Sequence, residues 1–407
     1  MRASAVTLAA GLFAASAVSA ENYLGFNSGA TLPDNSAKFE KDFEAEFRTA
    51  QNLVNAPGTF NAVRLYTNIQ AYSEGAPIEA FQAAMKTNTK ILLGVWASGV
   101  QNIDKELAAL KTAVNTYGKK FTDLVIGISI GSEDLYRISQ TGLINDPEGV
   151  GAGPDVIVKF IGDFKKAFAN TALSSIPVGH VDTWDVWANG TNKPVIDAVD
   201  FLGFDTYPYY ENGKGNSIDN APNLFDRAYK ATEAAAGGKP IWVTETGWPA
   251  TGPNWDLAVP SVPNAKQYWD EIGCAKLFNK VPTFWYNLRD SNPANKMQFA
   301  ITKNLSTTPL FDLTCPKVVP SSTSSAATPS QTSSGATSPS GSGSNSNTGS
   351  GSGSSSGTPT GGSNTGSGSA TQGSGTPIPT GAAAGVGRIS GAVYGALAVV
   401  AGGFALL

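Results

Sequence analysis

Hydrophobic residues follow two alternating patterns between residues 21 and 320. Short runs rich in β-branched and aromatic residues predict strands, and longer runs with apolar residues three and four positions apart predict helices. The pattern predicts eight strands, at residues 23–27, 62–67, 90–97, 124–132, 177–183, 201–207, 240–246 and 283–288. The predicted helices fall between them, at residues 37–54, 77–87, 103–117, 155–168, 194–198, 221–236 and 262–278.

Strands that alternate with helices form a parallel sheet, and eight such units predict an α/β fold, the closed (β/α)8 or TIM barrel. In the first predicted helix, Phe39, Phe43, Phe47 and Leu53 fall near one face with charged residues between them, as an amphipathic helix requires. The alternative is an open doubly wound sheet. That fold typically has a glycine-rich phosphate loop after its first strand, and residues 25–29 lack the required spacing.

A TIM barrel places its catalytic side chains where strands end and the following loops begin. That rule selects a short set of chemically useful residues from the whole chain. They are Asn27, Tyr66, Trp96, Glu133, Asp182, Trp184, Asp205, Tyr207, Glu245, Trp248, Trp285 and Asp290.

Two of these residues are glutamates, Glu133 after the fourth predicted strand and Glu245 after the seventh. Alternation along a strand puts Glu133 on the face of the small residue Gly127, and Glu245 on the face of Ile241 and Val243. Both are therefore predicted to point inward at the barrel mouth. The alternative is that each carboxylate only caps the helix that follows it. Two carboxyls at this place are what glycosidic bond cleavage requires.

The first 20 residues have the pattern of a secretory signal peptide. Arg2 precedes an apolar stretch at residues 5–18, and small residues end the segment at Ala20, where we expect cleavage. The alternative is a transmembrane anchor, but the apolar run is shorter than the roughly 20 residues that a bilayer requires.

The chain beyond the predicted barrel divides into a linker and a terminal segment. Residues 321–380 are nearly all Ser, Thr, Gly and Pro, which predicts either an O-glycosylated stalk or a plain flexible spacer. Residues 381–407 combine small residues from Gly381, a spacer with Arg388 and an apolar tail. This is the pattern of a GPI attachment signal, with Gly381 as the expected attachment residue. The alternative is a tail that stays in the bilayer.

Charge and cysteine content narrow the function further. The net charge is -4 and the isoelectric point is near 5.2, which argues against nucleic-acid binding and favours a neutral polymer as substrate.

In an oxidising compartment, Cys274 and Cys315 predict one disulfide, and two separate buried thiols are the alternative. Asn189 and Asn304 open N-glycosylation sequons. Because His180 is the only histidine, neither a metal cluster nor a Ser-His-Asp triad is predicted, and no cofactor is expected.

The segment at residues 242–249, Trp-Val-Thr-Glu-Thr-Gly-Trp-Pro, resembles the nucleophile signature of glycoside hydrolase family 17, the β-1,3-glucanases. The resemblance extends over essentially all of residues 21–320 and includes Val-Arg-Leu-Tyr at 63–66 and Thr-Tyr-Pro-Tyr at 206–209. It implies a (β/α)8 barrel, β-1,3-glucan as substrate, Glu245 as nucleophile and Glu133 as acid/base of a retaining mechanism. Ser132 is a departure, since many barrel glycosidases have Asn before the acid, and Ala250 is a smaller one.

With the leader, stalk and anchor signal, the architecture resembles that of a fungal GPI-anchored glucan endo-1,3-β-glucosidase. The resemblance implies a monomeric enzyme of cell-wall remodelling, secreted and held at the plasma membrane or cell wall. Substrate contacts are predicted for Tyr66, Asp182, Tyr207, Trp248 and Trp285. The alternative for the aromatic rings is ordinary core packing. Tyr207 is also predicted to hydrogen-bond Glu245.

Two other functions fit the same residues. A β-1,3-glucan transglycosylase uses both glutamates in the same way and passes the intermediate to a second glucan chain. A non-catalytic wall protein only binds polysaccharide, and the two carboxyls at the expected strand ends argue against it.

Overall fold

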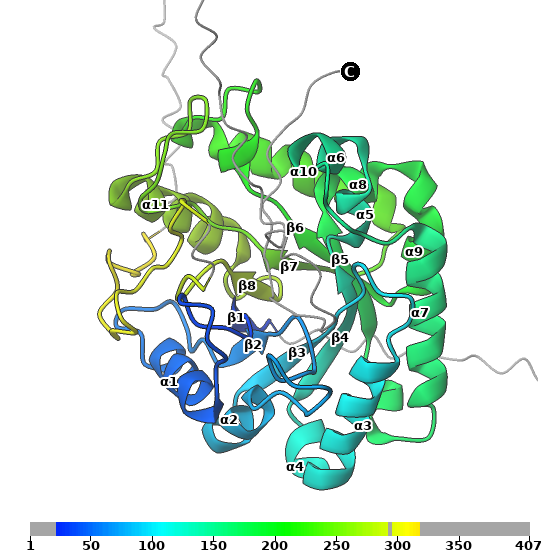
Figure 1. Cartoon of the computed structure of the whole chain (residues 1–407). Helices are drawn as coiled ribbons and strands as arrows, with labels where there is room; N and C mark the ends of the chain where they lie inside the picture. Colours follow the sequence, from blue (N-terminus) through cyan, green and yellow to red (C-terminus); the bar gives the residue numbers. More distant parts are fainter. Residues whose placement is uncertain (1–21, 292–294, 318–407) are drawn as a thin grey trace, which may run out of the picture. The chain divides into compact units, whose positions relative to one another are not determined.

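Eight parallel strands close into a barrel in chain order, as Figure 1 shows. The computed structural model describes residues 22–291 and 295–317, so the predicted leader, linker and anchor segment, Gly381 included, lie outside the described residues. The first strand pairs with both the second and the eighth, which closes the ring and confirms the predicted (β/α)8 barrel. The strands are Leu24–Asn27 (β1), Ala62–Arg64 (β2), Lys90–Val95 (β3), Val125–Ser132 (β4), Val178–Thr183 (β5), Phe201–Asp205 (β6), Ile241–Glu245 (β7) and Thr283–Trp285 (β8).

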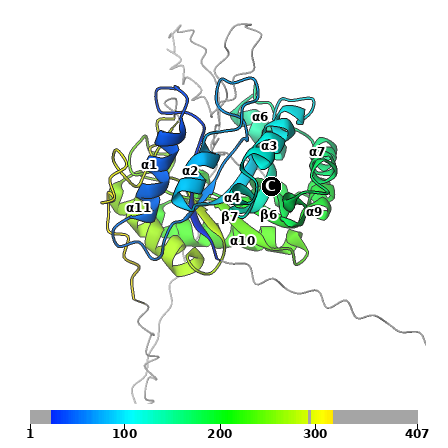
Figure 2. The same ribbon diagram turned by 90° about the horizontal axis from the view of Figure 1, so that it is seen from below.

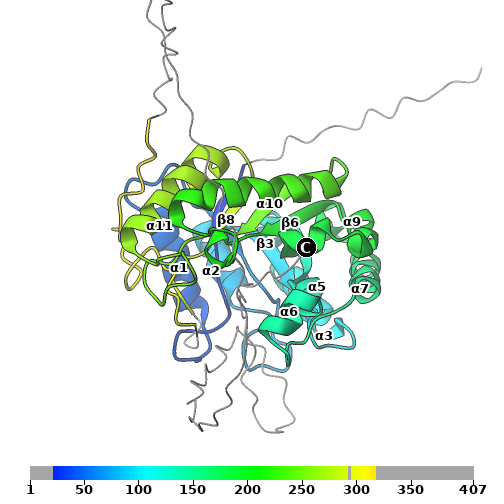
Figure 3. The same cartoon turned by 90° about the horizontal axis from the view of Figure 1, so that it is seen from above.

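Helices lie on the outside of the strands in Figure 1, and Figures 2 and 3 show these helices from below and from above. The α-helices are Glu40–Gln51 (α1), Ala80–Thr87 (α2), Asp104–Tyr117 (α3), Lys119–Thr122 (α4), Asp134–Arg137 (α5), Gln140–Asn145 (α6), Pro154–Ala167 (α7), Trp184–Ala188 (α8), Lys193–Ala198 (α9), Ala221–Ala236 (α10) and Val262–Tyr268 (α11). Short 3-10 helices occur at Ala172–Ser175, Gly190–Asn192, Pro208–Tyr210 and Ile218–Asn220, and a π-helix at Trp269–Leu277 continues α11. All seven predicted helices are present. Helices α4, α5, α6 and α8 were not predicted, because elements of four to six residues show no full helical period.

The ends of the helices follow from local chemistry. Helix α1 has acidic residues in its first turn and Arg48 in its last, which complements the helix dipole. Proline 154 opens α7, and Gly237 in the left-handed region ends α10. The prediction that Phe39 lies on the buried face of the first helix was wrong. Phe39 precedes α1 and is 49% exposed, whereas Phe43 and Phe47 are buried.

Two separate hydrophobic layers fill the molecule. Trp242 stacks on Phe201 inside the barrel with ring centroids 4.3 Å apart, and Ala62, Leu92 and Phe284 complete this inner cluster. A much larger cluster lies between the strands and the surrounding helices. Because the inner cluster closes the barrel interior with apolar side chains, polar groups gather where the strands end.

Both strands that carry the predicted carboxylates contain an extra residue. In β4 the pairing shifts between Ser129 and Ser132, and in β7 one residue is added where Glu245 pairs with Asp205. A β-bulge re-aims the side chains that follow it. The alternation predicted for Glu245 was therefore wrong. Its predicted face-mate Val243 packs in the outer layer, yet the carboxylate of Glu245 reaches the barrel interior.

Cys274 and Cys315 form a disulfide, with Cα atoms 5.4 Å apart, as predicted. It ties the π-helix after α11 to the segment that leaves the barrel. The two sequon asparagines, Asn189 and Asn304, are exposed. Across the ranges that the structure covers, no helix has the length and hydropathy to cross a bilayer.

Replacing both cysteines by serine is expected to lower the free energy of unfolding. The bridge spans 41 residues, and the loss of this constraint on the unfolded chain corresponds to about 4 kcal/mol. Chemical denaturation of the double variant and of the disulfide-bonded parent chain measures the difference in free energy of unfolding. Equal midpoints and equal slopes would show that the bridge does not stabilise the barrel.

Candidate active site

Glu245, the last residue of β7, lies buried at the barrel mouth and accepts three hydrogen bonds through its carboxylate. Arg64 and the hydroxyl of Tyr66 donate to Oε1 at 2.5 and 2.7 Å, and the hydroxyl of Tyr207 donates to Oε2 at 2.7 Å. The predicted bond between Tyr207 and Glu245 is thus confirmed. Three donors, one of them a cation, stabilise the ionised form of a carboxylate.

Arg64 links the strands that meet at this point. The guanidinium group donates to the side chains of Asn27 on β1 and Ser132 on β4 at 2.8 Å each, in addition to Glu245. Asn27 is itself oriented because its amide donates to the backbone carbonyl of Thr244 on β7 at 3.0 Å. The side chain of Arg64 is only 1% exposed. Four strands are therefore connected through one buried cation.

Glu133 follows β4 in an unusual conformation. Its φ angle is 56°, in the left-handed region, which costs a non-glycine residue about 1 to 3 kcal/mol. Gly131, two residues earlier, has φ 85°, and a Cβ there would lie 2.1 Å from Oδ2 of Asp134. The chain thus needs glycine at 131 in order to make the tight turn that presents Glu133.

The carboxyl of Glu133 is buried and lacks the donors that surround Glu245. Its Oε2 has no hydrogen-bond partner, and the nearest cation is Nη2 of Arg137 at 3.6 Å. Burial raises the pKa of Glu133 well above its usual range, and the negative charge of Glu245 raises it further. Glu133 is therefore driven toward its protonated form beside the carboxylate of Glu245.

A third carboxyl, that of Asp205 on β6, belongs to the same cluster. One oxygen each of Glu133, Asp205 and Glu245 lies within 4.8 Å of the others. Burial and the charge of Glu245 raise the pKa of Asp205 well above its usual range, and its Oδ2 has no partner. This is the one convergent acidic group in the part of the chain that the structure describes. Because Arg64 and Arg137 already face it, the cluster has the character of ion-paired carboxylates, and we assign no metal to it.

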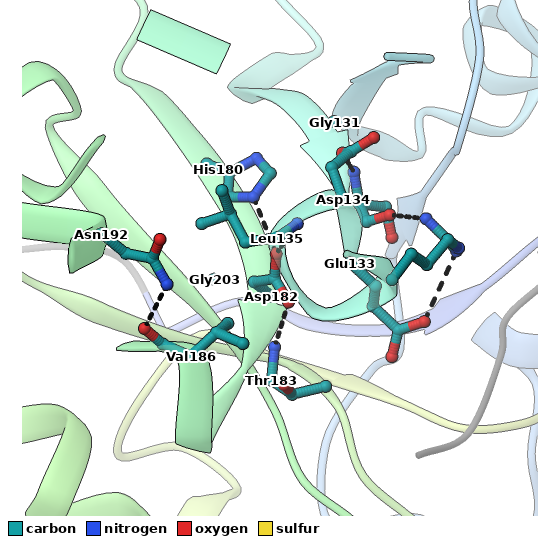
Figure 4. Close-up of polar contacts among 12 residues, drawn as sticks. Gly131, Glu133, Asp134, Leu135, His180, Asp182, Thr183, Val186, Asn192 and Gly203 are labelled. Atoms are coloured by element: carbon teal, nitrogen blue, oxygen red, sulfur yellow. Dashed lines mark hydrogen bonds and ion pairs between the residues drawn. The ribbon is translucent and has the colours of Figure 1, made fainter. Parts of the chain in front are cut away.

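Asp182 at the end of β5 was predicted to contact substrate, and it makes buried contacts instead. Figure 4 shows its carboxylate between the ring of His180 and the start of α5. Oδ2 accepts from the backbone N–H of Leu135 at 2.9 Å and lies 3.0 Å from Nε2 of His180, and Oδ1 accepts from Thr183. With 0% exposure, Asp182 supports the turn behind Glu133 rather than facing the mouth.

The predicted aromatic contacts divide into two groups. Tyr66 and Tyr207 meet at Glu245, as described above. Trp248 donates to the carbonyl of Val259 and is 2% exposed, and Trp285 packs 5.0 Å from Trp269 and is also 2% exposed. A sugar ring could not stack on either tryptophan without displacing these neighbours.

Three residues of the site carried no functional prediction. Arg64 lies in the predicted second strand, where a charged residue among buried neighbours signals a paired group. Asp205 was noted only as a strand end. Arg137 lies in a helix too short to predict, so nothing in the sequence pattern placed its side chain.

A (β/α)8 barrel with two buried carboxyls brought close together at the ends of β4 and β7 defines the class of barrel glycoside hydrolases. Residues 26–303 match the BtgE/BtgC glycoside hydrolase domain model, and the chain belongs to this family.

Relatives of known name agree with this assignment. The chain is 53% identical over 302 residues to a protein of Aspergillus oryzae named "Probable glucan endo-1,3-beta-glucosidase eglC", covering 74% of this chain and 64% of the relative. It is 53% identical to a protein of the same name from Emericella nidulans, with 72% and 62% covered. The chain thus spans just under two thirds of these relatives' length.

A solved structure shares the fold. It is the glycoside hydrolase family 17 beta-1,3-glucanosyltransferase from Rhizomucor miehei, with a TM-score of 0.54 and 24% identity over 70% of this chain and 98% of that one.

Proposed function

We propose that the protein hydrolyses β-1,3-glucosidic bonds within cell-wall glucan, with retention of configuration. Glu245 is the nucleophile and Glu133 the acid/base. The observation that carries this proposal is the contrast between the two buried glutamates, one held ionised by three donors and the other without a donor and with a raised pKa.

The first step joins the sugar to Glu245. The ionised carboxylate attacks the anomeric carbon while Glu133 gives its proton to the departing oxygen. Tyr66, Tyr207 and Arg64 hold the carboxylate of Glu245 in place for this attack. In the second step Glu133, now ionised, takes a proton from water, and that water releases the sugar.

The separation of the carboxyls supports retention rather than inversion. Oxygens of Glu133 and Glu245 lie within 4.8 Å of each other. Retaining enzymes place their carboxyl groups about 5 to 5.5 Å apart, whereas inverting enzymes leave about 6.5 to 9.5 Å for a water molecule. The names of the Aspergillus and Emericella relatives support β-1,3-glucan as the substrate.

We further propose that the protein is secreted and held at the cell surface by a GPI lipid, with N-glycans at Asn189 and Asn304. The support comes from the segments at residues 1–20 and 381–407, and from the exposure of both asparagines.

Glu245→Gln is expected to lower kcat by at least about 10³-fold, because a neutral amide cannot form the covalent intermediate. The measurement is product sizing after incubation of the full chain with a defined β-1,3-glucan oligosaccharide. Wild-type protein should give only shorter products. Longer products would indicate transglycosylation, the absence of products would contradict both enzymatic functions, and undiminished turnover by the variant would exclude Glu245 as nucleophile.

The pH profile of kcat/KM is expected to fall on the alkaline side because Glu133 must be protonated in the free enzyme. Since its pKa is raised, the protonated acid persists above the range of an ordinary glutamate and is lost as pH rises through that pKa. Glu133→Gln should remove this limb and lose activity on glucan, while an aryl glucoside with a good leaving group should still react with Glu245. A profile that stays flat into alkaline pH for the wild type would contradict the role of Glu133.

Phosphatidylinositol-specific phospholipase C should release the full chain from intact cells, because the proposed lipid is its substrate. Endoglycosidase treatment of the released chain should then lower its mass through loss of the N-glycans. A variant ending at residue 380 serves as control and should enter the medium without treatment. Retention of the full chain on the cells after phospholipase treatment would contradict the GPI anchor.

A further inference from the structure

Arg137 occupies a fixed position directly behind the acid/base. It is the last residue of α5, one turn after Glu133, and its backbone N–H donates to the carbonyl of Glu133 at 3.1 Å. Its side chain is only 10% exposed. Figure 4 shows Glu133 and Asp134 on the turn from which α5 begins.

The guanidinium group is held on several sides. Nη1 donates to the backbone carbonyl of Ser132 and, at 2.9 Å, to the hydroxyl of Ser98. The hydroxyl of Ser98 donates in turn to Asp134. The group also lies 5.7 Å from the ring centroid of Trp96, within cation–π range. These contacts leave the cation little freedom to move away from Glu133.

One nitrogen of this fixed group is unused. Nη2 of Arg137 and Oε2 of Glu133 are both buried, neither has a hydrogen-bond partner, and they face each other at 3.6 Å. A buried donor and a buried acceptor without partners cost free energy in this state. A state in which the two groups bond to each other recovers that cost. Shortening this 3.6 Å contact by about 0.7 to 0.9 Å would bring it to the usual 2.7 to 2.9 Å of a charged pair.

The charge balance around Glu133 indicates which state uses that bond. The groups that act on it are Glu245 on β7, Asp205 on β6, Asp182 on β5, Tyr286 after β8, and Tyr136 and Arg137 on α5. Arg137 is the cation that lies against Glu133 itself, 3.6 Å from its Oε2, whereas Arg64 on β2 faces the same cluster through its bonds to Glu245 and Ser132. While Glu245 is ionised, its charge favours the protonated form of Glu133. Once Glu245 is esterified, that charge is gone and the charge of Arg137 remains.

We propose that Arg137 is a positioning residue for the second step, in which it holds Glu133 ionised as the general base. This inference rests on the proposed retaining mechanism. In that step the water oxygen bonds to the anomeric carbon and its proton passes to Glu133. The ester bond to Glu245 breaks, with its electron pair returning to the carboxylate. Without Arg137, Glu133 would take up a proton from solvent in the glycosyl-enzyme and could not accept one from the attacking water.

The test compares the full chain with its Arg137→Met and Arg137→Gln variants. The substrate is the dinitrophenyl β-glycoside of a β-1,3-linked glucose disaccharide. This leaving group needs no acid, so kcat/KM reports attack by Glu245 and should stay within about twofold of wild type. Release of the sugar should become limiting, which lowers kcat on the order of tenfold or more, lowers KM with it, and gives a burst of dinitrophenolate.

Azide attacks without a general base, so it should raise kcat of both variants and yield the glycosyl azide. The acidic limb of kcat should move to higher pH, because removing a cation raises the pKa of Glu133 and ionisation then requires more alkaline solution. Arg137→Lys should recover most of the lost kcat. Arg48→Met, which removes an exposed guanidinium from α1, is the matched control and should behave as wild type.

Equal losses in kcat and kcat/KM, an unchanged kcat, or no effect of azide would each overturn the role of Arg137. Loss of the folded state in both neutral variants, seen by circular dichroism, would overturn it too, because the guanidinium would then serve the fold. A wild-type chain that neither turns over nor labels Glu245 would instead overturn the proposed function.

Discussion

The buried contact between Arg64 and Glu245 is the interaction on which the rest of the site depends. A carboxylate without water is unstable unless a cation and hydrogen-bond donors replace its hydration. Arg64 supplies the charge, and Tyr66 and Tyr207 supply the remaining donors. Because Arg64 also bonds Asn27 and Ser132, the same cation joins β1, β2, β4 and β7. Removing it would leave an uncompensated charge, at a cost of about 3 to 5 kcal/mol.

That contact also makes the two glutamates chemically unequal. Glu245 accepts from Arg64, Tyr66 and Tyr207, whereas Glu133 is buried close to it without such donors, which favours its protonated form. Asp205 experiences the same field and is likewise driven toward its neutral form. Burial, and after it the charge of Glu245, therefore sets the protonation of two neighbouring carboxyls. The acid and the nucleophile of the proposed mechanism thus follow from the burial of Glu133 together with the unequal sharing of donors between the two glutamates.

Much of the barrel could be predicted because each strand and long helix carries its own periodic signal. The eight strands and the disulfide needed no tertiary information. The site was predictable only as far as strand ends. Trp285 ends a strand, yet its ring packs against Trp269, since the direction of a side chain depends on the pairing of neighbouring strands. The role of Arg64 depends on its bond to Glu245, which lies 181 positions away in the sequence and is brought beside it only by the fold.

The irregular pairing in β4 and β7 determines which side chains at these strand ends reach Arg64, and Ser132 is one of them. A plain alternation would put Val243 and Glu245 on one face, and Val243 packs against the outer layer. The extra residue in β7 reverses the phase before Glu245, and the irregularity in β4 turns Ser132 toward Arg64, although Ile130 two positions earlier packs in the outer layer. Arg64 on β2 donates to Ser132 at the end of β4, the residue directly before Glu133. The serine hydroxyl thus accepts from the buried guanidinium at 2.8 Å and joins β4 to the network that holds Glu245.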